Sequence, residues 1–125
     1  MLIGIGIDIA DQNRFKEGLD KYGDGFLRQI LTEQEIKACA RYRFPIEHYA
    51  GKFAVKEAFM KAAGTGLREL NFQDIEVLNR ESGAPYILTS GKAETIIIER
   101  GITQVHVSLS HDGNMAVAVV VLEKN

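Results

Sequence analysis

The segment KFAVKEAFMKAAGTG, residues 52–66, determines how this chain folds. At about 100° per residue, its apolar side chains cover almost the whole circumference of a helix. A helix that is apolar on nearly every side is normally buried. Glu57 and Lys61 lie about 40° apart, in a sector otherwise occupied by Ala50 and Ala54. Either these alanines leave room for a ligand beside the two charged groups, or the two groups form an ordinary i,i+4 ion pair on a solvated face.

Composition predicts a single soluble domain that spans residues 1–125. The 125 residues are 46% hydrophobic and 26% charged, enough for one core and too few for two ordinary domains. A single cysteine, Cys39, excludes an internal disulfide and suits a reducing compartment. The first residues lack a basic leader, and no apolar run approaches the roughly 20 residues that span a bilayer. We therefore expect a cytoplasmic protein without a membrane segment.

The net charge of −2 conceals an uneven distribution. Residues 37–61 carry six Lys or Arg against two acids, whereas residues 71–125 carry four basic against seven acidic side chains. A short basic stretch in an acidic chain favours one defined anionic ligand over duplex nucleic acid, which requires a broad basic stripe. A solvated basic face is the alternative.

The N-terminus alternates strictly over residues 2–9. Ile3, Ile5, Ile7 and Ile9 fall on one side of a predicted strand, and the other side includes Gly4, Gly6 and Asp8. We expect the isoleucine side to be packed. Glycine inside a strand often marks the close approach of a ligand or another backbone, and here a neighbouring chain is one candidate.

The rest of the first half of the chain is predicted to be helical. Short helices are predicted over 11–19 and 24–30. Thr32 and Glu35 have the spacing of a capping box that begins another helix. Pro45 is suited to the first turn of the long helix, and Gly64 to its C-terminal cap.

The second half of the chain is predicted to form mainly β-sheet. Strands are predicted at 72–78 and 85–88, separated by a turn, and a helix closed by Gly101 follows them. A hairpin built around Asp112-Gly113 ends the chain, and its last strand, NMAVAVVVL, is apolar on both faces and therefore expected to be covered on both. Helices between separate groups of strands predict an α+β fold with a small, mostly antiparallel sheet packed with one long helix.

Asp8, Glu57 and Lys61 are the candidate catalytic residues. Asp8 ends the bare side of the first strand, where it either caps the next helix or binds a hard cation. Glu57 is the natural second metal ligand, because a carboxylate on a mostly buried helix needs a partner. Two carboxylates with one ammonium group suit phosphoryl transfer, which depends on positioning and on neutralising phosphate charge.

Two other polar groupings are less specific. Gly64, Thr65 and Gly66 follow the C-terminus of the long helix, where the helix dipole does not favour an anion. His106 and Ser110 share one face of a predicted strand, and His111 lies at the turn. These groups are either solvated or available to hydrogen-bond phosphate.

Five segments together resemble holo-acyl-carrier-protein synthase, the small 4′-phosphopantetheinyl transferase family. They are GIGIDIAD, KFAVKEAFMKAAGTG, NFQDIEV, SGAPYI and HVSLSHD, and they occur in the family's order over essentially the whole chain. The resemblance implies Mg²⁺-dependent transfer of 4′-phosphopantetheine from coenzyme A to a serine of apo-acyl carrier protein, releasing 3′,5′-ADP, for fatty acid biosynthesis.

The resemblance also implies roles for individual residues. Asp8 and Glu57 would bind Mg²⁺ on the diphosphate, and Lys61 would neutralise or protonate the departing phosphate. Lys52 stands where the family usually has Arg, which keeps the charge but loses bidentate geometry. The residues implied to line the coenzyme A site are Lys52, Lys56, Gly64, Thr65, Gly66, Pro85, His106, Ser110 and His111.

Acyl carrier proteins are typically acidic, so Arg14, Lys21 and Arg28 on the early helices are candidate docking charges. Arg41 and Arg43 are further candidates only, because their segment matches the family poorly. The resemblance implies a homotrimer with each site at a subunit interface. A domain that binds coenzyme A without turnover is the alternative function, although binding alone needs no acidic pair beside an anionic ligand.

Overall fold

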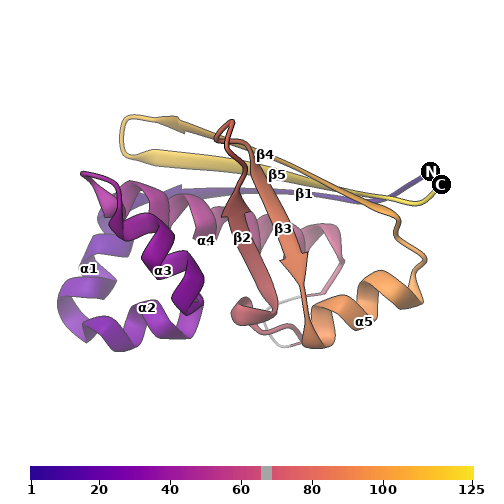
Figure 1. Ribbon diagram of the computed structural model, residues 1–125, viewed down its shortest axis with the longest axis horizontal. Helices are drawn as coiled ribbons and strands as arrows, with labels where there is room; N and C mark the ends of the chain where they lie inside the picture. The colour runs from indigo at the N-terminus through magenta and orange to yellow at the C-terminus, as the bar shows by residue number, and fades with distance from the viewer. Residues whose placement is uncertain (66–68) are drawn as a thin grey trace.

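The computed structural model describes residues 1–65 and 69–125 of the chain (Figure 1). Its helices and strands follow one another in the order expected from the sequence. The elements are β1 (Leu2–Asp11), α1 (Gln12–Tyr22), α2 (Asp24–Ile30), α3 (Glu33–Ala40), α4 (Pro45–Ala62), a short 3₁₀ helix (Phe72–Asp74), β2 (Ile75–Asn79), β3 (Pro85–Thr89), α5 (Gly91–Glu99), β4 (Gln104–Asp112) and β5 (Met115–Glu123).

Two antiparallel sheets form the β part of the molecule. The three-stranded sheet has the order β1-β5-β4, so the first strand pairs with the last. The other sheet is the β2–β3 hairpin, which crosses in front of α4 in Figure 1. This arrangement confirms the predicted α+β class, with one long helix and several short ones.

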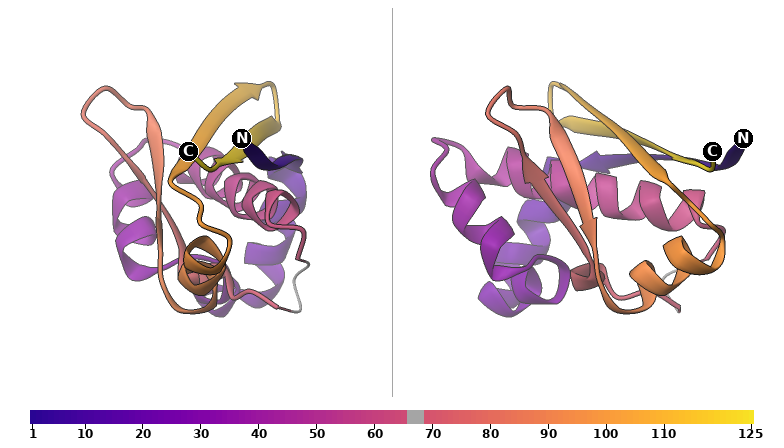
Figure 2. Two further views of the ribbon diagram at one scale, coloured as in Figure 1. Left: turned by 90° about the vertical axis from the view of Figure 1, so that its right-hand side faces the viewer. Right: turned by 45° about the vertical axis from the view of Figure 1, so that its right-hand side comes forward.

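Helix α4 lies under the three-stranded sheet and runs through the centre of the molecule (Figures 1 and 2). Ala54, Val55, Ala58 and Phe59 have no exposed surface. Helices α1 and α3 and strand β2 also pack against α4, and the side that carries Lys61 stays open (Figure 2). The prediction that this helix is buried is therefore confirmed.

The predicted orientation of β1 is wrong. Gly4 and Gly6 face α4 of the same chain, whereas Ile5, Ile7 and Ile9 are 60%, 57% and 60% exposed. The isoleucines and glycines do lie on opposite sides of β1, as predicted. The glycine side is the packed one, because the backbone of α4 comes too close for a side chain there. The close neighbour of the two glycines is thus α4, not a second chain.

Among the residues that the structure describes, only one face of the last strand, β5, is fully covered. Ala116, Ala118, Val120 and Leu122 are buried under α4, while the alternate residues of β5 are partly exposed. The register aligns Ile7, Val119 and Ser108 across the outer face of the sheet. Across that face, isoleucines on β1 therefore give way to valines on β5 and to polar side chains on β4.

Helix capping follows the sequence closely, with one correction. Asp11, not Asp8, caps α1, because its carboxylate accepts a hydrogen bond from the amide of Asn13 at 2.9 Å. The capping box of Thr32 and Glu35 is present at the start of α3. Pro45 occupies the first turn of α4, and Gly64 takes a left-handed conformation just beyond its end.

The predicted strand 72–78 begins three residues late. Phe72–Asp74 form a 3₁₀ turn, and β2 starts at Ile75. In the hairpin, β4 extends through Asp112, and the turn falls at Gly113 and Asn114. No helix within residues 1–65 or 69–125 is long and apolar enough to cross a membrane.

Candidate active site

The structure brings together the three candidate catalytic residues. Lys61, near the end of α4, donates hydrogen bonds from its ammonium group to the Asp8 carboxylate at 3.1 Å and to the Ile7 carbonyl at 3.0 Å. The side chain of Lys61 is 55% exposed and that of Asp8 15% exposed. The pair therefore joins α4 to β1 and remains open to solvent on the lysine side.

Glycine in β1 permits this approach. A Cβ placed on Gly4 would lie 1.8 Å from the carbonyl oxygen of Ala62, so any side chain there would overlap the backbone of α4. The strand and the helix are consequently in close backbone contact at Gly4 and Gly6, just before Asp8 in the strand. Glu57 and Lys61 project from α4 at the level of this contact.

Glu57 is partly buried beside the pair. Burial raises the pKa of Glu57, the Asp8 carboxylate raises it further, and Lys61 opposes both effects. The charge of Asp8 therefore acts on Glu57 across the strand–helix junction. Ala50 and Ala54, predicted to leave room for a ligand, are fully buried, so the open side of the site lies toward Lys61.

The carboxylates fit a hard divalent cation. A cation such as Mg²⁺ would relieve the repulsion between the Asp8 and Glu57 carboxylates, which the Lys61 ammonium group offsets in part. Two carboxylates suffice as protein ligands when phosphates and waters complete the coordination. Among residues 1–65 and 69–125, no cluster of three or more His, Cys, Asp or Glu residues could bind a metal alone. The donor set thus suits a metal that binds together with an anionic substrate.

A surface hollow of about 360 Å³ opens beside these groups. It is lined by Ile7, Asp8, Ile9 and Lys61. Its polar groups are the Asp8 carboxylate and the Lys61 ammonium group, and its walls are exposed isoleucines. The hollow therefore lies where the reactive groups meet the outer apolar face of the sheet.

The structure does not support direct contacts from Lys52 or Lys56 to coenzyme A. Lys56 has no exposed surface, and its ammonium group bonds to Glu35 at 2.7 Å and to the Phe72 carbonyl at 2.9 Å. Lys52 is 4% exposed and bonds to the Val77 carbonyl at 2.6 Å. The predicted second polar stripe of α4 is therefore an internal one, because β2 and the 3₁₀ turn cover it.

The remaining coenzyme A candidates are distributed over several elements. Gly64 and Thr65 follow α4, Pro85 begins β3, and Gly66 lies outside the described residues. His106 is 2.9 Å from Glu123 at the opposite end of β4 from the hairpin turn. Gly64 thus lies next to Lys61, with its amide donating to the Lys61 carbonyl at 3.0 Å, whereas Pro85 and His106 lie on other elements.

Ser110 and His111 lie on opposite faces of β4. Ser110 is on the exposed outer face, whereas His111 packs toward α4, where a Cβ on Gly51 would lie 3.1 Å from its Nε2. Within residues 1–65 and 69–125, this buried Nε2 atom has no hydrogen-bond partner. Gly51 precedes Lys61 by ten residues, about 15 Å along the helix, so His111 is remote from Lys61 in the same chain.

The candidate docking charges lie on α1 and α2. Arg14 borders an apolar hollow of about 300 Å³ that also includes Ile9, Phe26 and Phe53. The ammonium group of Lys21 lies 5.3 Å from the centre of the Tyr22 ring. Arg14 is therefore next to the strand that carries Asp8.

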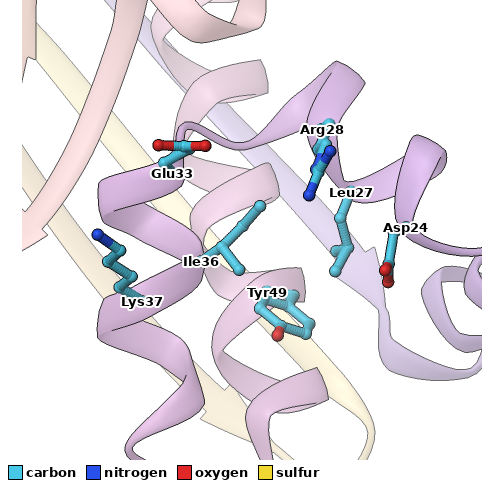
Figure 3. A pocket seen from close by; sticks show the side chains of 7 residues that line it. All are labelled: Asp24, Leu27, Arg28, Glu33, Ile36, Lys37 and Tyr49. Carbon is cyan, nitrogen blue, oxygen red and sulfur yellow. The ribbon is translucent and has the colours of Figure 1, made fainter.

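Arg28 borders a different hollow, of about 410 Å³, between α2, α3 and α4 (Figure 3). Leu27, Ile36 and Tyr49 point toward one another there. The charged side chains of Asp24, Arg28, Glu33 and Lys37 lie around them. This hollow contains none of the candidate catalytic residues and carries charges of both signs.

One buried acid has a larger role than its sequence position indicated. Glu35 was expected only to cap α3, but its carboxylate also accepts hydrogen bonds from Lys56 and from the Val77 amide, the latter at 2.7 Å. The polar residues of an otherwise apolar helix were the available signal, because a buried lysine needs a buried acid.

Comparison with known proteins places this geometry in a family. The model of the 4′-phosphopantetheinyl transferase superfamily matches residues 4–120. The chain belongs to this superfamily. It is 42% identical to holo-[acyl-carrier-protein] synthase of Geotalea daltonii, over 99% of this chain and 100% of that protein.

Solved structures of superfamily members share the fold. The synthase from Neisseria meningitidis matches with a TM-score of 0.92 and 34% identity, over 99% of this chain and 100% of that one. The synthase from Bacillus anthracis, solved in complex with CoA (3′,5′-ADP), matches with a TM-score of 0.82 and 42% identity, over 100% and 99%. The predicted membership of the phosphopantetheinyl transferases is therefore confirmed.

Proposed function

We propose that this chain is a holo-acyl-carrier-protein synthase. It transfers 4′-phosphopantetheine from coenzyme A to a serine of apo-acyl carrier protein, giving holo-acyl carrier protein and 3′,5′-ADP, and it serves fatty acid biosynthesis in the cytoplasm. Residues 1–125 form one transferase domain. The observation that carries the proposal is the meeting of Asp8 and Lys61 beside Glu57 in a chain that the superfamily model matches over residues 4–120.

Asp8 and Glu57 are the proposed ligands of Mg²⁺. The bound ion would supply positive charge to the diphosphate of coenzyme A. In the reaction, the serine hydroxyl oxygen bonds to the phosphorus that carries pantetheine and gives up its proton to water. The bond from that phosphorus to the leaving phosphate oxygen breaks. The half-exposed Lys61 Nζ neutralises or protonates this leaving oxygen.

Coenzyme A binding is proposed to involve residues of more than one element. We assign it to Gly64, Thr65, Gly66, Pro85, His106, Ser110 and His111. Lys52 and Lys56 are omitted because their ammonium groups are buried and already bonded within the chain. The unpartnered Nε2 of His111 supports a ligand-binding role for that residue.

The site is proposed to be completed by a neighbouring chain in a homotrimer. The outer face of the three-stranded sheet exposes Ile5, Ile7 and Ile9, and a contiguous exposed apolar surface marks an interaction site. His111 is remote from Lys61 within one chain, so we assign the site of Asp8 and Lys61 to two chains. A neighbour would contribute Ser110 from the outer face of its β4 and His111 from beside its hairpin turn. Three identical contacts of this kind close a ring.

Carrier protein docking is proposed to use Arg14, Lys21 and Arg28. Arg14 is best placed, since it borders a hollow that also includes Ile9, one residue beyond Asp8. An acidic carrier protein would be steered toward these charges, and raised salt would slow its association.

One assay tests the function. The protein is incubated with coenzyme A, Mg²⁺ and apo-acyl carrier protein, and the mass of the carrier protein is followed. We expect a mass gain equal to one phosphopantetheine group, its loss in EDTA, and its recovery on adding Mg²⁺. Coenzyme A binding without any mass gain would overturn the transferase assignment and favour a binding domain.

A further inference from the structure

Helix α4 lacks the polar face that normally fixes the rotation of a helix about its axis. From Ala50 to Ala62 its residues are buried except along the narrow stripe of Phe53, Glu57 and Lys61, and many of the buried ones are alanine or glycine. An amphipathic helix is oriented by turning its apolar stripe to the core, but a helix that is apolar all round gains little from one rotation over another. Directional contacts must therefore define how α4 is turned.

Two buried lysines supply such contacts from one side of α4. Lys52 and Lys56 are one helical turn apart and both reach toward β2. The Lys52 ammonium group donates to the Val77 carbonyl at 2.6 Å and to Asn79 Oδ1 at 3.2 Å. The Lys56 ammonium group donates to the Phe72 carbonyl at 2.9 Å. Both lysines therefore tie α4 to the segment 72–79.

Glu35 connects the same lysine to a third element. One carboxylate oxygen accepts hydrogen bonds from Lys56 at 2.7 Å and from the Thr32 amide at 2.8 Å. The other accepts the Val77 amide at 2.7 Å. The start of α3, the middle of α4 and strand β2 thus meet at one carboxylate with both oxygens bonded.

Burying this ion pair is not an efficient way to stabilise the fold. The cost of removing two charges from water offsets much of their attraction, and apolar replacements of such pairs are often neutral or stabilising. The best-attested benefit of a buried polar pair is that it specifies one arrangement among several that would pack equally well. An all-round apolar helix is where this benefit is largest.

The rotation of α4 determines the geometry of the active site. Glu57 directly follows Lys56, and Lys61 lies four residues beyond Glu57 along the helix. Side-chain atoms about 6 Å from a helix axis move roughly 2 Å when the helix turns by about 20°. Catalytic groups must be held within about 0.5 Å, so even a small rotation would separate Lys61 from Asp8.

We propose that Glu35, Lys56 and Lys52 are positioning residues that fix the rotation of α4 and thereby hold Glu57 and Lys61 against Asp8. They act on the transfer reaction without touching substrate. The kinetic part of this inference rests on the proposed function, whereas the geometric part does not.

The test is the double variant Glu35→Gln/Lys56→Met, which removes the buried pair without leaving an unpaired charge. We expect a folded protein whose kcat falls about 100-fold, the loss typical of a 1 Å misplacement, with the KM for coenzyme A changed less than about twofold. Its crystal structure should show Lys61 Nζ beyond hydrogen-bond distance of Asp8.

The matched control is Val55→Ala, a cavity in the same buried stretch of α4 that leaves every lysine contact intact. It should lower stability but keep kcat within about twofold of wild type at temperatures where it is folded. Lys52→Met is the second variant if the double variant does not fold, because it leaves no buried acid without a partner. It should lower kcat, whereas a direct contact to coenzyme A would raise KM.

Each outcome has a defined meaning. A folded double variant with wild-type kcat, or with reduced kcat and an intact Lys61–Asp8 contact, overturns the positioning role. If wild-type protein shows no transfer, the proposed function fails, and the crystallographic Lys61–Asp8 contact in the variants still tests the positioning role.

Discussion

Gly6 and Ala58 lie so close that a Cβ on the glycine would be 1.9 Å from the alanine carbonyl oxygen. The overlapping atom belongs to the backbone of α4, so no side-chain rotation relieves it. The separation of β1 from α4, and therefore of Asp8 from Lys61, depends on the absence of a Cβ at Gly6 as it does at Gly4.

Gly6→Ala is therefore expected to destabilise the protein and to reduce transfer. Overpacking usually costs about 1–3 kcal/mol, and a clash with backbone belongs at or above the upper end of that range. Urea denaturation at equilibrium measures the loss. The matched control is Gly25→Ala in α2, where an added Cβ meets nothing within 4 Å and should stabilise by about 0.4–1 kcal/mol. Equal stability of Gly6→Ala and wild type would show that β1 and α4 can move apart freely.

Glu57 should make stability depend on pH in a defined direction. Burial and the Asp8 charge raise the pKa of Glu57 above the ordinary value of 4.5. Below that ordinary value the group is protonated in both the folded and unfolded states. As pH rises through the raised pKa, the folded state loses stability because its carboxylate ionises less readily than that of the unfolded chain.

The variant Glu57→Gln cannot ionise, so its stability relative to wild type should increase as pH rises in EDTA. Denaturation midpoints of both proteins across the acidic to neutral range provide the measurement. Adding Mg²⁺ at neutral pH should stabilise wild type and leave Glu57→Gln less affected. A difference between the proteins that stays constant with pH would contradict the environment described for Glu57.

Lys61 and Lys56 should respond differently to replacement by methionine. Lys61 is half exposed, so its loss should change the free energy of unfolding by no more than about 1 kcal/mol. The same change should lower kcat with little effect on the KM for coenzyme A. Lys56→Met instead leaves Glu35 buried without its partner and should cost about 3–5 kcal/mol. Denaturation and steady-state kinetics on both variants separate the two roles, and a stable, fully active Lys61→Met would exclude Lys61 from the reaction.

The sequence was sufficient for much of the fold because the relevant signals are local. Thr32 and Glu35 formed a capping box, and Pro45 and Gly64 marked the ends of α4. Asp8, Glu57 and Lys61 were recognisable as polar groups on otherwise apolar elements. Each of these features depends on residues within a few positions of one another, or on the period of one helix or strand.

The errors concern which surface each element packs against. Alternation in β1 separated isoleucines from glycines, but only the approach of α4 decides that the glycine side is inside. Likewise, the helical period could not show that Lys56 lies opposite Glu35, 21 residues away. Such pairings arise from tertiary structure.

Mixing inactive chains tests whether each site is shared. If Asp8 of one chain meets His111 of the next, random co-refolding of Asp8→Ala with His111→Ala chains in equal amounts leaves about one quarter of all sites with both residues intact. Transfer should then rise well above that of either parent protein. Sites built within single chains would have none intact, and activity would stay at the average of the parents.

In a second mixture, single-chain sites predict the higher activity and shared sites the lower. Comparing the two mixtures therefore controls for refolding yield. Wild-type chains co-refolded with equal amounts of the double variant Asp8→Ala/His111→Ala keep about one half of their sites intact if each site belongs to one chain. Shared sites in a cyclic trimer leave only about one quarter intact. Native mass spectrometry confirms that mixed trimers have formed. Activity near one quarter of wild type in both mixtures is the result that the interface site predicts, because only a site divided between neighbouring chains makes the two mixtures equal.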